Sequence, residues 1–180
     1  MNKITQLLSQ LEAAEAEIAE FDRLEEKAKN NLSQAVTANT TVAEAKSRIL
    51  DARLTLDLMA AKKVNAEPLR DKIADELKAT LARIVTGWND GITAMREATE
   101  AEIITANTTF FNGDERAARC WWEQGPMNAQ PIFDRYRDAY YPTESLRSSP
   151  GWGVVEMAGH FLRHLRKNAP VLGLIPDELV

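Results

Sequence analysis

Apolar residues recur at every seventh position along the first sixty residues of the chain. This stripe consists of Leu7, Ala14, Phe21, Ala28, Ala35, Val42, Ile49 and Leu56. A second stripe, three residues ahead of the first, consists of Ile4, Leu11, Ile18, Glu25 and Leu32. Alternating spacings of three and four are typical of a coiled-coil seam, and polar side chains fill the positions between the stripes. The pattern predicts a long amphipathic helix that pairs with other helices.

The segment Thr37–Thr41 raises the question of whether this helix is continuous. Thr41 and Glu44 have the Thr-x-x-Glu spacing of a capping box, which marks a helix start. The first stripe nevertheless continues in phase, and the second moves by one position to Ala45, Ala52 and Met59. A straight helix drifts by about 20° per heptad, which accounts for such a shift. We therefore expect near-continuity, with a kink or short interruption at Asn39.

The first firm turn is expected at Lys62–Pro68, because two lysines suit a helix C-terminus and proline suits a first turn. The next helix extends towards Phe110 through Leu69, Ile73, Leu77, Leu81, Ile84, Trp88, Ile92 and Met95. Gly87 and Gly91 flank Trp88 and favour a kink or a close helix crossing. A tight turn would fold the two long helices into an antiparallel hairpin.

The two arms of this expected hairpin differ in length, at about 90 Å and about 65 Å. The longer arm would leave apolar surface that another subunit or the C-terminal half must cover. We expect an oligomer seam formed by Ile4, Leu7, Leu11, Ile18 and Phe21. Phe21→Asp would then lower the oligomer order. Glu25, at a seam position, either fixes register or oligomer state through a partner, or is solvated at a loose kink.

Composition changes near Asn112-Gly113 and divides the chain into residues 1–111 and 112–180. One proline precedes this point and six follow it, together with all three tyrosines and both histidines. Short helices are expected from Glu115 to Gln124 after an Asp114 cap, over 132–141, and from Trp152 to Lys167. The predicted fold is all-α, with a long antiparallel helical hairpin of coiled-coil character and three shorter C-terminal helices packed on it or on a neighbouring subunit.

Charge and cysteine content limit the compartment and the partners. The 180 residues carry a formal net charge of -5, which argues against a broad grip on nucleic acid. Cys120 is the only cysteine, so no intramolecular disulfide can form, as is common in reducing compartments. No apolar run reaches the length of about 18 residues that a membrane span requires. We expect a cytoplasmic location without membrane attachment.

The C-terminal half contains the residues predicted to contact a partner. They are Trp121, Trp122, Arg135, Tyr136, Arg137, Tyr140 and Tyr141. These residue types are enriched at protein–protein hot spots. Arginines interleaved with aromatic rings also occur in single-stranded nucleic-acid binders, with Arg163, Arg166 and Lys167 as further cations. Asp134 and Asp138 would oppose phosphate, so the protein-partner interpretation is preferred.

One triplet has the spacing of metal ligands. Glu156, His160 and His164 lie four residues apart and share one helix face. Phe161, however, occupies the position next to His160 where a metalloprotease motif has its glutamate, and the chain has only two histidines. We interpret the histidines as the edge of an amphipathic helix and expect no metal site. No catalytic triad, P-loop or dinucleotide motif is present, and no cofactor is expected.

These observations favour a non-enzymatic structural or adaptor protein. It would self-associate as a homo-oligomer through its long helices and present the Trp/Tyr/Arg-rich surface to a protein partner. The alternatives are a nucleic-acid-associated module and a metal-dependent enzyme at Glu156, His160 and His164.

Overall fold

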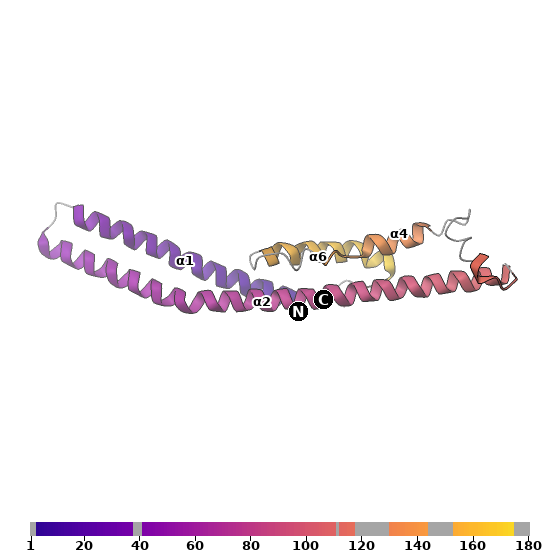
Figure 1. The fold of residues 1–180 in the computed structure, drawn as a ribbon. Coiled ribbons are helices and arrows are strands. Elements are labelled where there is room, and N and C mark those ends of the chain that lie inside the picture. The colour runs from indigo at the N-terminus through magenta and orange to yellow at the C-terminus, as the bar shows by residue number, and fades with distance from the viewer. Residues whose placement is uncertain (1–2, 38–40, 111, 118–129, 144–152, 175–180) are drawn as a thin grey trace. The chain divides into compact units, whose positions relative to one another are not determined.

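A computed structural model describes residues 3–37, 41–110, 112–117, 130–143 and 153–174. Its helices are α1 (Lys3–Thr37), α2 (Val42–Phe110), α4 (Gln130–Ala139), α6 (Val154–Asn168) and the short 3-10 helix η2 (Pro170–Leu172) (Figure 1). The described ranges contain no strand. The predicted all-α class, with a long helix pair and shorter C-terminal helices, is confirmed. None of the helices in these ranges is long and apolar enough to cross a membrane.

The chain forms two compact units whose boundary falls inside α2. The first unit spans Lys3–Leu77, and the second begins at Lys78. The first therefore consists of α1 and the beginning of α2. The second consists of the rest of α2 and the C-terminal helices. This structural boundary differs from the compositional one at residue 112, because the long helix belongs to both units.

In the first unit, α1 lies beside the beginning of α2 (Figure 1). The buried side of α1 consists of Ile4, Leu7, Leu11, Ile18, Phe21, Ala28 and Ala35. On α2, the buried residues of this unit are Ala52, Met59, Ala74 and Leu77. Both sets follow spacings of about three and four, so each helix buries one stripe. Polar contacts along the edges join Lys3 to Glu76 (2.9 Å) and place the Lys62 ammonium 5.3 Å from the centre of the Phe21 ring.

The expectation of near-continuity with a kink or short interruption at Asn39 is met only in the interruption, and Asn39 itself lies outside the described residues. The first helix ends at Thr37, the second begins at Val42, and the capping box at Thr41 is formed. The Thr41 amide donates to the Glu44 carboxylate (3.2 Å), and the Glu44 amide donates to the Thr41 hydroxyl (3.4 Å). Val42, which continues the seven-residue stripe in sequence, is 72% exposed. The local cap therefore prevails over the periodicity at the start of α2.

The expected turn at Lys62–Pro68 is wrong, because α2 is continuous from Val42 to Phe110 with Pro68 inside it. Proline removes one backbone hydrogen bond, here to the Val64 carbonyl. Pro68 and Val64 are both exposed, so water can hydrate that carbonyl. Ion pairs of Lys63 and Glu76 hold α2 against α1 on both sides of the proline. Tertiary contacts thus override the local turn signal.

In the second unit, the shorter helices pack on the later part of α2. The buried residues there include Leu81, Val85, Trp88 and Ile92 from α2, Phe133 and Ala139 from α4, and Met157, Phe161 and Leu165 from α6. The expected helices at 132–141 and 152–167 are confirmed with shifted ends. The Asp114 cap is confirmed by the hydrogen bond that the Ala117 amide donates to its carboxylate (3.0 Å). Residues 118–124 of the expected short helix lie outside the described residues.

The two glycines beside Trp88 do not mark a close helix crossing. Gly87 and Gly91 are exposed, and a Cβ atom added at either would have no neighbouring atom within 4 Å. The expectation of a close crossing at this point is therefore wrong.

We expect Pro68→Ala to stabilise the protein. Proline is roughly 3 kcal/mol less favourable than alanine inside a helix, so the free energy of unfolding should rise by up to about that amount. The measurement is urea unfolding followed by circular dichroism, with Glu67→Ala, an exposed neighbour, as the control. An unchanged or lower stability would contradict a continuous helix at Pro68.

Candidate functional site

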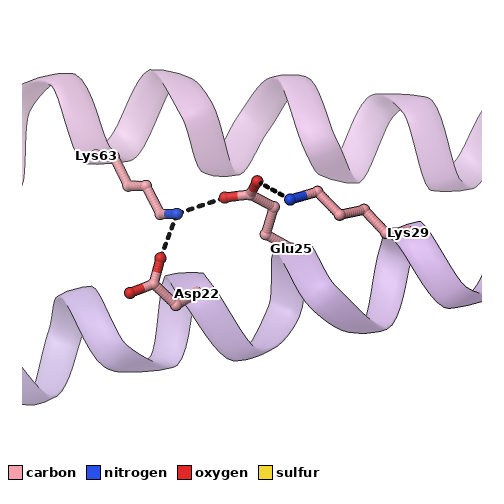
Figure 2. Close-up of polar contacts among 4 residues, drawn as sticks. All are labelled: Asp22, Glu25, Lys29 and Lys63. Carbon is pink, nitrogen blue, oxygen red and sulfur yellow. Dashed lines mark hydrogen bonds and ion pairs between the residues drawn. The ribbon is translucent and has the colours of Figure 1, made fainter.

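The most connected polar site of the first unit is an ionic cluster between α1 and α2. The Lys63 ammonium pairs with the carboxylates of Asp22 and Glu25, and Glu25 also pairs with Lys29 at 2.7 Å (Figure 2). Lys63 and Glu25 are largely covered, whereas Asp22 is exposed. Of the two interpretations of Glu25, pairing is therefore confirmed. A polar seam residue that pairs with a residue of the facing helix favours one register of the two helices.

The cluster changes the protonation behaviour of its members. Hydrogen bonds from Lys29 and then Lys63 lower the pKa of Glu25 from its ordinary value of 4.5 to about 2. Hydrogen bonds to Asp22 and then Glu25 raise the pKa of Lys63. Glu25 and Lys63 therefore keep their charges at neutral pH. Such charges can hold two helices in register.

A groove of about 500 Å³ lies further along the same helix pair. Its lining consists of Leu24, Lys27, Ala28, Asn31, Gln34 and Ala35 from α1, and Arg48, Asp51, Ala52 and Thr55 from α2. The three small alanines leave this space open between the helices. The charged side chains of its lining are Lys27, Arg48 and Asp51.

In the second unit, two neighbouring α2 residues that the sequence analysis did not select bind the end of α4. The Asn89 side chain donates to the Tyr141 carbonyl (2.8 Å) and accepts from the Tyr141 amide (2.9 Å). The Trp88 indole donates to the Ala139 carbonyl (2.7 Å). Asn89 is one of the few buried polar residues, so its pairing is needed to offset desolvation. The available sequence signal for this site was a polar residue, Asn89, directly beside Trp88, which belongs to the apolar stripe of the helix.

The structure separates the residues predicted to contact a partner. Arg135, Arg137 and Tyr140 are exposed. Tyr136 is only partly exposed, and its hydroxyl lies 2.8 Å from that of Thr99, while Tyr141 is buried with its ring edge-on to Phe161. Trp121 and Trp122 lie outside the described residues, as does Cys120. Two of the seven residues therefore contribute to the fold, and three are available to another molecule.

The triplet with metal-ligand spacing is not gathered into a site. His164 lies with Nε2 2.7 Å from the Ala139 carbonyl, so this nitrogen carries the proton and donates. Glu156 and His160 are exposed on the same helix. Within the described ranges, no three histidine, cysteine, aspartate or glutamate side chains are placed to hold a metal ion.

The predicted oligomer seam is buried within the chain itself. Ile4, Leu7, Leu11, Ile18 and Phe21 are all covered, so the uncovered surface that motivated self-association does not lie there. Phe21→Asp would disturb the helix pair whether or not the chain self-associates. Self-association itself stays a prediction, and it requires another surface.

Such a surface exists on the opposite side of α2. Leu50, Leu54 and Leu58 are 58%, 59% and 53% exposed, and we call these three residues the leucine face. Leu54 lies about 200° around the helix from the buried Ala52. The sequence analysis missed this face because it followed only the seven-residue stripe. The spacing of four between three leucines was the signal that could have found it.

Comparison of the chain with protein-family models finds no match, and neither curated proteins nor solved structures match it. Functional inference therefore depends on the residues described above.

We expect Glu25→Gln to lower the stability of the helix pair at neutral pH. The decrease of stability on acidification should be smaller in the variant. A carboxyl whose pKa is lowered in the folded state stabilises the protein above its unfolded pKa. That contribution is lost as the pH falls from about 4.5 to about 2. Melting temperatures between pH 7 and pH 2 should therefore converge for wild type and variant at the acid end. The control is Glu26→Gln, because Glu26 is exposed and lies next in sequence.

Asn89→Ala should loosen the end of α4. It leaves the Tyr141 amide and carbonyl without their partner, at a cost of about 1–3 kcal/mol for each buried group that stays unpaired. Hydrogen exchange of the Tyr141 amide should accelerate, and the urea midpoint should fall. Asp90→Ala, at the exposed neighbouring position, should change neither. Unaltered exchange in Asn89→Ala would refute the role assigned to this side chain.

Proposed function

We propose that this protein is a non-enzymatic structural or adaptor protein that self-associates through its long helices. The observation that carries the proposal is the exposed leucine face of α2. The lone cysteine suits an intracellular assembly of this kind. The polar clusters described above support the fold, and none combines a nucleophile with a base.

The helix pair is proposed to be an antiparallel hairpin with coiled-coil character. Contacts at the beginning of α1 reach late positions of α2, as in Lys3 with Glu76. Later positions of α1 meet earlier ones of α2, as in Glu25 with Lys63. This inverse order supports opposite directions, and the spacings of three and four on the buried stripes support coiled-coil packing.

The leucine face supports an assembly role because its exposure has no use within the helix pair. Three large apolar side chains in a row on a helix leave unfavourable contact with water that another surface would remove. Each buried leucine would contribute about 1.5–3 kcal/mol. A helix that is apolar on two opposite sides is suited to lie between two neighbours.

The C-terminal half is proposed to supply a contact for a protein partner through Arg135, Arg137 and Tyr140. Tyrosine and arginine are enriched at hot spots, and all three side chains are exposed. Nucleic-acid binding remains the alternative proposal. It receives less support, because Arg137 already pairs with Asp134 (3.0 Å) and Asp138 (3.3 Å).

We expect a dimer or larger species in solution, measured as absolute mass by light scattering behind a sizing column. Because the contact is apolar, the mass should not fall when the salt concentration rises from about 0.1 M to about 1 M. A monomer at all protein concentrations would refute self-association. Dissociation by salt alone would instead indicate an assembly held by charges.

A further inference from the structure

We propose that a second copy of the chain binds the leucine face through its own leucine face, in an antiparallel arrangement with Leu54 at the two-fold axis. The inference rests on the proposed self-association and specifies its surface, direction and register. The apolar and charged side chains on the exposed side of α2 support this arrangement.

The leucine face is complementary to itself in this arrangement. Leu50 and Leu58 lie at equal distances before and after Leu54, so rotation about the axis places Leu50 against Leu58 of the second copy. Leu54 meets Leu54. The exposed fractions of the three side chains are similar, so each loses a comparable amount of surface. A two-fold contact of this kind uses one patch on both copies, as closed homodimers require.

The charges next to the leucine face favour the same register. Arg53 and Asp57 lie on one side of it, about 100° and 60° from its centre. In the antiparallel arrangement, Arg53 comes within about two residues along the axis, or about 3 Å, of Asp57 of the second copy. The two copies together form a cluster of two arginines and two aspartates with no net charge. No ion pair within the described ranges involves Arg53 or Asp57.

A parallel two-fold axis would bring opposite sides of the two helices together and place Arg53 near Asp51 instead. Asp51 already lines the groove with Arg48 of its own chain, so the antiparallel arrangement is the one that gives a cation to Asp57 as well. The antiparallel arrangement also brings the exposed Val42 to the level of Val64 of the second copy, on the same side as Arg53. These valines are 72% and 71% exposed. The leucine face itself, from Leu50 to Leu58, extends over about 12 Å of α2.

The first test compares Leu54→Glu with Val36→Glu by sedimentation equilibrium. Val36 is 69% exposed near the end of α1, so both variants add a charge at an exposed apolar position. Leu54→Glu places two carboxylates at the axis and should raise the dimer dissociation constant by about tenfold or more. Val36→Glu should behave as wild type. Circular dichroism confirms that both variants keep their helices.

The outcomes separate this inference from the proposed function. A wild-type monomer overturns both, and the leucine face would then be open to a different protein. A wild-type dimer that persists unchanged in Leu54→Glu overturns only the inference, because self-association would use another surface. Equal weakening by Val36→Glu would also overturn it, since the effect would not be specific to the leucine face.

The second test addresses direction and register by reversing charges. Arg53→Asp alone gathers four carboxylates at the contact and should weaken the dimer. Combining Arg53→Asp with Asp57→Arg restores equal numbers of opposite charges in the same places and should recover the wild-type dissociation constant. Failure of the double variant to recover it, while Leu54→Glu still disrupts the dimer, overturns the antiparallel register.

Discussion

The pairing of Glu25 with Lys63 is the constraint on which the first unit depends. Two alanines, Ala28 and Ala35, form the later part of the stripe that α1 buries, and such small residues alone would tolerate several longitudinal positions of one helix against the other. A largely covered carboxylate and a largely covered ammonium accept only the position in which they meet. A mismatch would leave the partly covered Lys63 ammonium without its carboxylates and Glu25 with Lys29 alone. The cluster thus contributes specificity of alignment more than stability.

The second unit solves a similar problem with neutral groups. There the end of α4 is bound by the Asn89 amide and the Trp88 indole, which use backbone atoms of Tyr141 and Ala139 as partners. Backbone atoms occur at every residue, so the selectivity comes from position: Tyr141 lies just past the end of α4, where its amide and carbonyl are not used by the helix. In each unit, therefore, polar side chains set among apolar contacts fix the position of one segment against another.

The sequence predicted the class of the fold and most of the helices, because periodic apolar stripes and caps are local signals. It misplaced the arms of the long helix pair. The seven-residue stripe through Val42 argued for continuity, but the local cap at Thr41 prevailed. Pro68 with two lysines argued for a turn, but α2 is continuous there and meets α1 through distant residues such as Lys63 and Asp22. Tyr136 and Tyr141 were assigned to a partner because the residues that their side chains meet, Thr99 and Phe161, are distant in sequence. Leu50, Leu54 and Leu58 repeat at a spacing of four, which is a local signal outside the main stripe.

The order in which contacts occur along the chain also bears on how the protein is made. The first unit joins two segments that follow one another directly, so it has low contact order and needs nothing beyond Leu77 to close its own ion pairs. During synthesis, α1 and the beginning of α2 can therefore associate while the C-terminal residues are still being added. The second unit must wait, because Trp88 and Asn89 emerge some fifty residues before the α4 backbone that they bind. On the ribosome, the beginning of α2 would pack against α1 before α4 could bind the later part of α2.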